Sequence, residues 1–227
     1  MNSSGRVHLK VDEIEAILRV AQKDSKRNAL AICLAFNHGL RVSELAGGRK
    51  ESTKVVDGVE KYTPSLLPLQ LSDIDFKNKQ ITIRRLKGSR ETTQPFIYHR
   101  GKTWLSDEAA LRTYLEERIE DGSGLLFTGQ KGALSRWTLE VAFRKYREEA
   151  SKEREAKGKP PIPDVSFHAL KHSTGTHLSS QDGATVYKTA AWLGHANVQN
   201  AQIYWHPDQR SIGEFVQRSM VRAASGF

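Results

Sequence analysis

Apolar residues recur at helical spacing in the first part of the chain. They predict an amphipathic helix over residues 10–22, with Val11, Ile14, Ile17, Leu18, Val20 and Ala21 on its inner side. Residues 25–37 are apolar on nearly every side, so this stretch predicts a largely buried helix. Gly39 follows that helix and is expected to break it.

Strict alternation of apolar and polar residues marks a β-hairpin in the middle of the chain. Residues 80–84 alternate around Ile81 and Ile83, and residues 92–97 form the expected returning strand. Further helices are predicted at 106–119 and 136–152, with Ser106 and Ser135 as their caps. The second of these is expected to turn an apolar side inward, made of Trp137, Val141, Phe143 and Tyr146.

Three more helices are predicted in the last third, at 165–180, 185–193 and 209–223. We therefore expect a mainly helical α+β fold with a small antiparallel sheet. Its expected divisions are a flexible tail over 1–8 and one domain over 9–227. Within that domain we expect a surface insertion loop over 47–68 and a C-terminal tail helix over 208–227. The insertion has two open explanations, a tolerated loop or a contact with a partner.

Composition narrows the class of protein. The 227 residues carry 35 Lys and Arg against 26 Asp and Glu, a net charge of +9, which favours a polyanionic partner over a merely basic surface. Cys33 is the single cysteine, so internal disulfides are excluded and a reducing compartment fits. No signal peptide or apolar run of about 18 residues is present, so no membrane association is expected.

Reactive side chains gather near the C-terminal end. His168, Lys171 and His172 stand at i, i+3 and i+4, so they project from one face of the predicted helix. His195 follows Gly194, and Tyr204 comes nine residues later. Each residue alone has an ordinary structural explanation, and only the set indicates a phosphate site. No cysteine or histidine cluster with metal-ligand spacing occurs, and no nucleotide-binding loop, so we expect no metal and no cofactor.

An arginine upstream completes the candidate set. Arg41 follows directly on the buried helix, so it needs a partner or faces a ligand. Glu44, three residues later, can hold its guanidinium group in place.

The order of these motifs resembles the tyrosine recombinase (phage integrase) family. The motifs are Gly-Leu-Arg-Val-Ser-Glu-Leu at 39–45, a lysine in a basic turn, His-x-x-Lys-His at 168–172, Leu-Gly-His at 193–195 and the tyrosine nine residues later. The resemblance covers about residues 9–218. It implies the recombinase catalytic domain and a site-specific recombinase or integrase, typical of phages and mobile elements, which cuts and rejoins DNA through a covalent 3′-phosphotyrosine.

The resemblance also implies a role for each site residue. Tyr204 is the expected nucleophile, Arg41 the phosphate clamp, and Lys87 the proton donor to the leaving 5′-oxygen. His168 and His195 are expected to position the phosphate and move protons, and Lys171 to be catalytic, with Glu44 and His172 in support. Further DNA contacts are expected from Arg84, Arg85, Arg90, Arg144 and Lys145. The implied partners are double-stranded DNA and other copies of the chain in a tetrameric synaptic complex, in the cytoplasm at the nucleoid.

Two departures from the family pattern leave alternatives open. Lys171 stands where the family has an arginine, and a lysine lacks the bidentate fork. This indicates a slower enzyme, a variant subgroup, or a DNA-binding regulator that cuts poorly. The N-terminal core-binding domain of the family is expected to be absent, because few residues precede the first predicted helix. The tail helix covers either a neighbouring subunit or its own core.

Overall fold

A computed structural model describes residues 8–47, 50–56, 59–64, 66–86, 89–129, 132–181 and 183–205. Its helices are α1 (Val11–Asp24), α2 (Lys26–His38), α3 (Val42–Ala46), α4 (Asp107–Leu115), α5 (Arg136–Glu155), α6 (Ala169–Ser179), α7 (Val186–Trp192) and α8 (Gln199–Gln202), with short 3₁₀ turns at Leu71–Asp73 and Thr103–Leu105. Its strands are β1 (Lys50–Val56), β2 (Val59–Pro64), β3 (Ile74–Asp75), β4 (Gln80–Ile83), β5 (Thr92–Pro95), β6 (Thr128–Gly129) and β7 (Gly132–Ala133). The expected mainly helical α+β class is confirmed.

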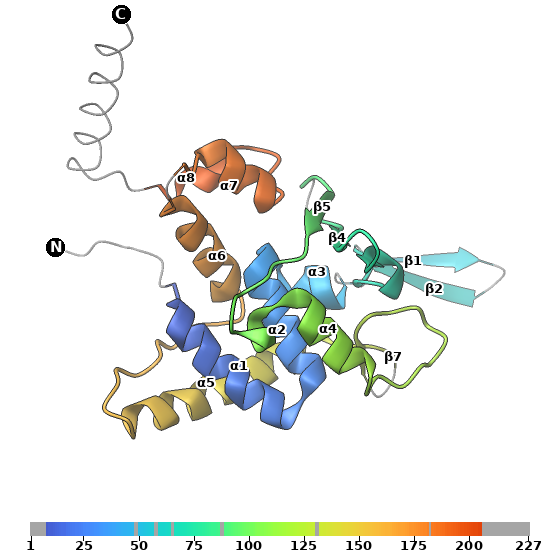
Figure 1. Cartoon of the computed structure of the whole chain (residues 1–227). Helices are drawn as coiled ribbons and strands as arrows, with labels where there is room; N and C mark the ends of the chain where they lie inside the picture. The colour runs from blue at the N-terminus through green and yellow to red at the C-terminus, as the bar shows by residue number, and fades with distance from the viewer. Residues whose placement is uncertain are drawn as a thin grey trace, which may run out of the picture.

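Helix α2 is the centre of the core. It packs against α1, α4, α5 and α6, and every residue from Asn28 to its end is buried (Figure 1). The Ser25 hydroxyl accepts a hydrogen bond from the N–H of Asn28 at 3.3 Å and so caps the start of the helix. Gly39, with φ of +60°, ends it in the left-handed conformation. The turn that carries Arg41 is therefore fixed by the most buried helix of the protein.

The two predicted strands are β4 and β5, and they form a three-stranded antiparallel sheet with β3 in the order β3–β4–β5. In β4, Ile81 and Ile83 point into the core, and Ile81 lies opposite Gln94 of β5. The turn between β3 and β4 contains Lys79, which has φ of +54°. This sheet leads the chain from the core to the basic turn that contains Lys87, which lies outside the described residues.

The expected insertion loop is instead a hairpin of regular strands. β1 and β2 pair with each other in an antiparallel two-stranded sheet, with Thr53 opposite Tyr62. The hairpin extends to one side of the helices in Figure 1. Valine and threonine, which favour strands, recur in the segment, and Asp-Gly, a pair common in tight hairpins, stands between the two strands in the sequence. The expected surface insertion therefore contains regular strands, which were not predicted from the sequence.

Two predicted helices differ in detail. Helix α5 buries Leu139, Phe143, Tyr146 and Ala150, whereas Trp137 and Val141 are 74% and 39% exposed. The apolar side was misassigned because these two residues lie off the stripe that begins at Leu139. Helix α4 ends at Leu115, before Ile119, because the chain turns there.

Helix α6 begins at Ala169, four residues later than predicted. The preceding segment is held against α5 instead, since Arg147 Nη1 donates to the carbonyl of Val165 at 2.7 Å. His168 thereby becomes the N-cap residue of the helix. The predicted helix at 185–193 is confirmed as α7, with the Thr185 hydroxyl accepting from the N–H of Lys188 at 3.1 Å.

The predicted N-terminal tail, apart from its last residue, and the predicted C-terminal helix lie outside the described residues. No helix in the described part of the chain is long and apolar enough to span a membrane.

Candidate active site

An open cavity of about 350 Å³ brings together every predicted catalytic residue except Lys87, which lies outside the described residues. The turn after α2, helix α6, the turn after α7, and α8 with the residues that follow it supply its walls. Its lining residues are Arg41, His168, Lys171, His172, His195, Gln199, Asn200, Ile203 and Tyr204. The spacing of the sequence motifs thus corresponds to one place in the fold.

Arg41 is fixed by Glu44 at the start of α3. Arg41 Nη1 donates to Glu44 Oε1 at 2.9 Å, and the backbone N–H of Arg41 donates to Oε2 at 2.9 Å. Burial acts to raise the pKa of Glu44, but the charges of Lys171 and Arg85 outweigh it, and the net pKa lies below its usual value. Glu44 is therefore an ionised carboxylate that orients Arg41, as the sequence predicted.

Lys171 is buried at the back of the cavity. Its Nζ donates to the carbonyl of Gly39 at 2.6 Å and to that of Leu193 at 3.1 Å. Burial lowers its pKa to about 7, against the opposing charge of Glu44. The side chain, only 2% exposed, therefore joins the turn before Arg41 to the turn before His195.

Tyr204 lies against α6. Its hydroxyl is 3.2 Å from Nδ1 of His172, and the rings of His168 and His172 meet edge to face at 4.5 Å between centroids. Its ring rests on Gly175, where a Cβ would come within 2.6 Å of Cζ. The phenol is thus held beside two imidazole rings. Sequence reasoning missed Gly175 because close approach leaves no local signal.

His195 is placed by the turn that ends α7. Gly194 has φ of +68°, and the N–H of His195 donates to the carbonyl of Ala190 at 2.8 Å. Burial, followed by the charge of Lys171, lowers the pKa of His195 to about 4. At neutral pH its ring is therefore uncharged. Its Nδ1 is buried without a hydrogen-bond partner among the described residues.

The five predicted DNA contacts differ in their surroundings. Arg90 and Arg144 are exposed. Arg84 forms a bidentate pair with Asp73 at 2.6 Å, and Lys145 Nζ donates to Asp24 Oδ1 at 2.8 Å. Arg85 is the exception.

The assignment of Arg85 to DNA needs correction. Its side chain is buried, and its guanidinium group bonds protein carbonyls and Glu44. A group enclosed in this way is not presented to a phosphate. The sequence contained an indication of this. Alternate residues of a strand point to the same side, and Arg85 follows Ile81 and Ile83, whose side chains point inward, in that alternation.

A family model matches the part of the chain that contains His168, Lys171, His195 and Tyr204. The model of the phage integrase family matches residues 64–210. The chain belongs to the phage integrase family.

Gln199 and Asn200 are site residues that the motifs did not single out. They precede Tyr204 by about one helical turn, a position that could have indicated them.

The alignments with curated relatives cover most of this chain but only about half of each relative. Tyrosine recombinase XerA of Thermococcus kodakarensis is 28% identical over 196 residues, which are 85% of this chain and 55% of that protein. Tyrosine recombinase XerC of Bifidobacterium longum is 27% identical over 210 residues, 86% of this chain and 50% of that protein. The chain therefore spans about half the length of these curated relatives.

Solved structures confirm the fold. A XerA recombinase superposes with a TM-score of 0.65 at 22% identity, covering 96% of this chain and 65% of that one. The XerH site-specific recombinase bound to its difH substrate gives 0.63 at 23% identity, covering 95% and 55%. The fold shared with these family members is that of a tyrosine recombinase.

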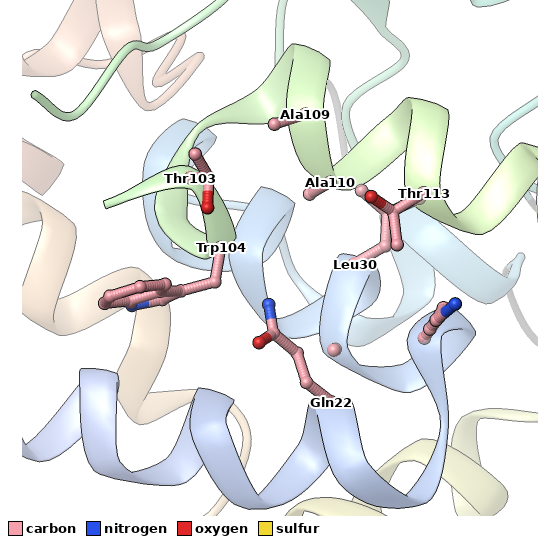
Figure 2. A pocket seen from close by; sticks show the side chains of 9 residues that line it. Gln22, Leu30, Thr103, Trp104, Ala109, Ala110 and Thr113 are labelled. Atoms are coloured by element: carbon pink, nitrogen blue, oxygen red, sulfur yellow. The ribbon is translucent and has the colours of Figure 1, made fainter. Parts of the chain in front are cut away.

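A second cavity, of about 340 Å³, lies between α1, α2 and α4 (Figure 2). Apolar and polar side chains both line it, among them Gln22, Leu30, Thr103, Trp104 and Thr113. Lys26 is the single charged group in its wall, and its ammonium pairs with Glu117. The lining of this cavity contains no second titratable group, whereas the cavity around Tyr204 contains several.

Proposed function

We propose that the chain breaks and rejoins DNA strands at specific sites through a covalent 3′-phosphotyrosine. The observation that supports this most is the meeting of Tyr204 with Arg41, Lys171 and three histidines in one cavity. A phenol needs nearby cations or a base to attack at neutral pH, because its usual pKa is about 10. This cavity supplies both.

In the proposed step, one phosphorus–oxygen bond forms as another breaks. Tyr204 Oη forms a bond to phosphorus, the bond from phosphorus to the 5′-oxygen breaks, and the protein stays joined to the 3′-phosphate. Nδ1 of His172, 3.2 Å from the hydroxyl, is placed to accept the phenolic proton in its neutral form. The leaving 5′-oxygen takes a proton, for which family resemblance implies Lys87. Rejoining is the reverse, so no external energy source is needed.

Charge builds on the non-bridging oxygens in the transition state, and fixed cations lower the barrier by stabilising it. Arg41 is held for this task by Glu44 and retains an exposed part, with 29% of its side chain accessible. Lys171 adds a charge from behind, with its Nζ bound to two carbonyls. Lys171 therefore acts on the phosphate through the field it creates rather than as a bidentate ligand.

The proposal includes double-stranded DNA as partner and a tetramer on two duplexes, acting at the DNA of the nucleoid. The net charge of +9 supports a polyanionic partner. Exchange of both strands between two duplexes needs four breaks, and each described site offers one Tyr204. Four chains are therefore the smallest set that supplies the nucleophiles.

A trapping experiment tests the proposal. The full chain is mixed with a pool of duplexes that have a randomised centre, a fluorophore at the 5′ end of one strand, and nicks a few nucleotides downstream of candidate cleavage positions. After cleavage the short downstream piece diffuses away, so the adduct cannot reverse. We expect a fluorescent protein band that survives a denaturing gel and disappears with Tyr204→Phe.

One alternative is favoured by a specific feature, the lysine at 171 in place of an arginine. A DNA-binding regulator with weak or lost cleavage would bind duplexes recovered from the same pool in a mobility-shift assay yet form no adduct on them. That outcome would replace the recombinase proposal with the regulatory one. An adduct that depends on Tyr204 excludes the regulator.

A further inference from the structure

Arg85 connects the two turns that carry catalytic residues. Its Nη2 donates to the carbonyl of His38 at 3.0 Å and to that of Trp192 at 2.9 Å. Its Nη1 donates to the carbonyl of Gly39 at 3.1 Å and to Glu44 Oε2 at 3.3 Å. One guanidinium group thus meets the last carbonyls of two helices, α2 and α7, at once.

Helix ends explain why an arginine suits this place. The last carbonyls of a helix lack partners inside the helix and carry partial negative charge. Arg85 satisfies such groups on both helices with a planar fork, which a lysine cannot reproduce. Arg41 lies two residues after Gly39, and His195 lies three residues after Trp192. The distance between the two turns therefore depends on Arg85.

The turn before His195 is shaped around the arginine stem. A Cβ on Gly194 would lie 2.7 Å from Cγ and 2.8 Å from Nε of Arg85. The glycine lets the backbone approach the arginine closely, and its φ of +68° turns the chain there. His195 is thus presented by a turn that rests on Arg85.

We propose that Arg85 is a positioning residue, which holds Arg41 and His195 at the spacing that strand cleavage requires; this rests on the function proposed above. Arg85 touches no DNA in this role. It acts through Glu44, which orients Arg41, and through the end of α7, which presents His195. Lys171 braces the same two turns from the other side through the carbonyls of Gly39 and Leu193.

Arg85→Lys tests this, because it keeps the charge and removes the fork. Arg154→Lys is the matched control: Arg154 is also buried and bonds one backbone carbonyl, that of Pro160, and one carboxylate, that of Asp12. Three quantities are measured on the full chain: the single-turnover rate of adduct formation, the salt dependence of DNA binding, and the ¹⁵N signals of the histidine rings during a pH titration.

We expect Arg85→Lys to slow adduct formation by roughly 100-fold, the effect of a misplacement of about 1 Å. DNA affinity and its salt slope should stay as in the wild type. The His195 ring signals should move and its pKa should rise, because the turn loosens and the ring gains solvent. Arg154→Lys should change none of the three.

Several outcomes overturn the inference. A salt slope smaller by about 0.9 would show that Arg85 contacts a phosphate instead. Unmoved His195 signals would show that the turn does not depend on it, and the same changes in Arg154→Lys would show general loosening. If no version of the protein forms an adduct, the proposed function fails, and the histidine titration still decides the role of Arg85.

A second variant covers the case in which Arg85→Lys does not fold. Gly194→Ala keeps the guanidinium group and displaces its stem, since the new Cβ would overlap Arg85. It should move the His195 signals in the same direction and slow adduct formation. Normal signals in a folded Gly194→Ala protein would contradict the inference.

Discussion

Tyr204 lies flat against Gly175, so closely that a Cβ on the glycine would come within 2.6 Å of Cζ and 2.7 Å of Cε1. Gly175 stands three residues after His172 in α6, whose Nδ1 faces the Tyr204 hydroxyl. The seat of the ring and the partner of its hydroxyl are therefore on one face of the same helix. The absence of a side chain at Gly175 therefore sets the position of the Tyr204 ring.

Gly175→Ala should separate helix stability from cleavage. Alanine is favoured over glycine inside a helix by about 1 kcal/mol. The added methyl group must push the Tyr204 ring away, and such overpacking costs about 1–3 kcal/mol. We expect adduct formation to slow by at least roughly 10-fold while the free energy of unfolding falls by at most about 2 kcal/mol. Single-turnover trapping and urea denaturation measure the two, and an unchanged rate would mean that the ring moves at no cost.

Glu44→Gln should be strongly destabilising. The carboxylate is the buried anion among Arg41, Arg85 and Lys171, and removal of one partner from a buried charge cluster costs about 3–5 kcal/mol. The amide keeps the shape of the side chain but leaves these cations unbalanced. Urea denaturation should therefore show a loss of about 3 kcal/mol or more.

The control for that substitution is a surface carboxylate. Glu108→Gln breaks the pair with Arg112, whose side chain is 59% exposed, and such pairs are worth less than about 1 kcal/mol. Equal losses in the two variants would mean that Glu44 contributes no more than a surface charge.

The sequence was enough to predict which residues line the site, but not which contacts hold those residues in place. Helix caps such as Ser25 and Gly39 are local signals, and they place Arg41 correctly at the end of a buried helix. Family resemblance then links Arg41, His168, Lys171, His195 and Tyr204, and the fold brings all five to one cavity. Their chemical roles stay predictions.

The supports of the site depend on contacts between distant segments. Arg85 and Trp192 are more than a hundred residues apart, and no pattern near either predicts that one bonds the other. From the sequence alone, Gly194 indicates a turn and Gly175 a weak position in a helix. The structure shows instead that Arg85 packs closely on Gly194 and Tyr204 on Gly175. The alternation of the strand could have predicted that Arg85 points inward, but its basic neighbours favoured a position on the surface.

The β1–β2 hairpin should be dispensable for folding. Its strands pair only with each other among the described residues, and its two ends are close, since a Cβ on Gly47 would lie 3.0 Å from Cγ of Pro68. Shortening a surface loop changes the closure entropy little. Replacing residues 48–65 by Gly-Ser should therefore shift the unfolding free energy by less than about 1 kcal/mol.

The same variant decides between the two explanations of the insertion. Unchanged DNA affinity in a mobility-shift assay would identify the hairpin as a tolerated addition. A loss of affinity with intact folding would identify it as a contact with DNA. A large loss of stability would show instead that the hairpin supports the core, against this prediction.

Lys171→Arg should change how cleavage depends on pH. Lys171 has its pKa lowered to about 7 by burial, so above pH 7 the free wild-type protein loses this charge, whereas an arginine keeps it. The ratio of variant to wild-type rates should therefore rise as pH increases beyond about 7, by up to roughly tenfold per pH unit if the charged form alone is active.

The same pKa shift should make the wild type more stable, relative to Lys171→Arg, as pH rises. The folded pKa of Lys171 lies below its unfolded value of about 10.4, so between about pH 7 and that value the unfolded chain binds more protons. The unfolding free energy of the wild type should therefore rise with pH across this window relative to Lys171→Arg, which has no such proton linkage. Second-order trapping rates and urea denaturation at pH 6, 7, 8 and 9 would measure both trends, because these pH values lie on either side of about 7. A rate ratio that is independent of pH would show that the charge at position 171 does not act in cleavage, and the lysine would then be a structural brace alone.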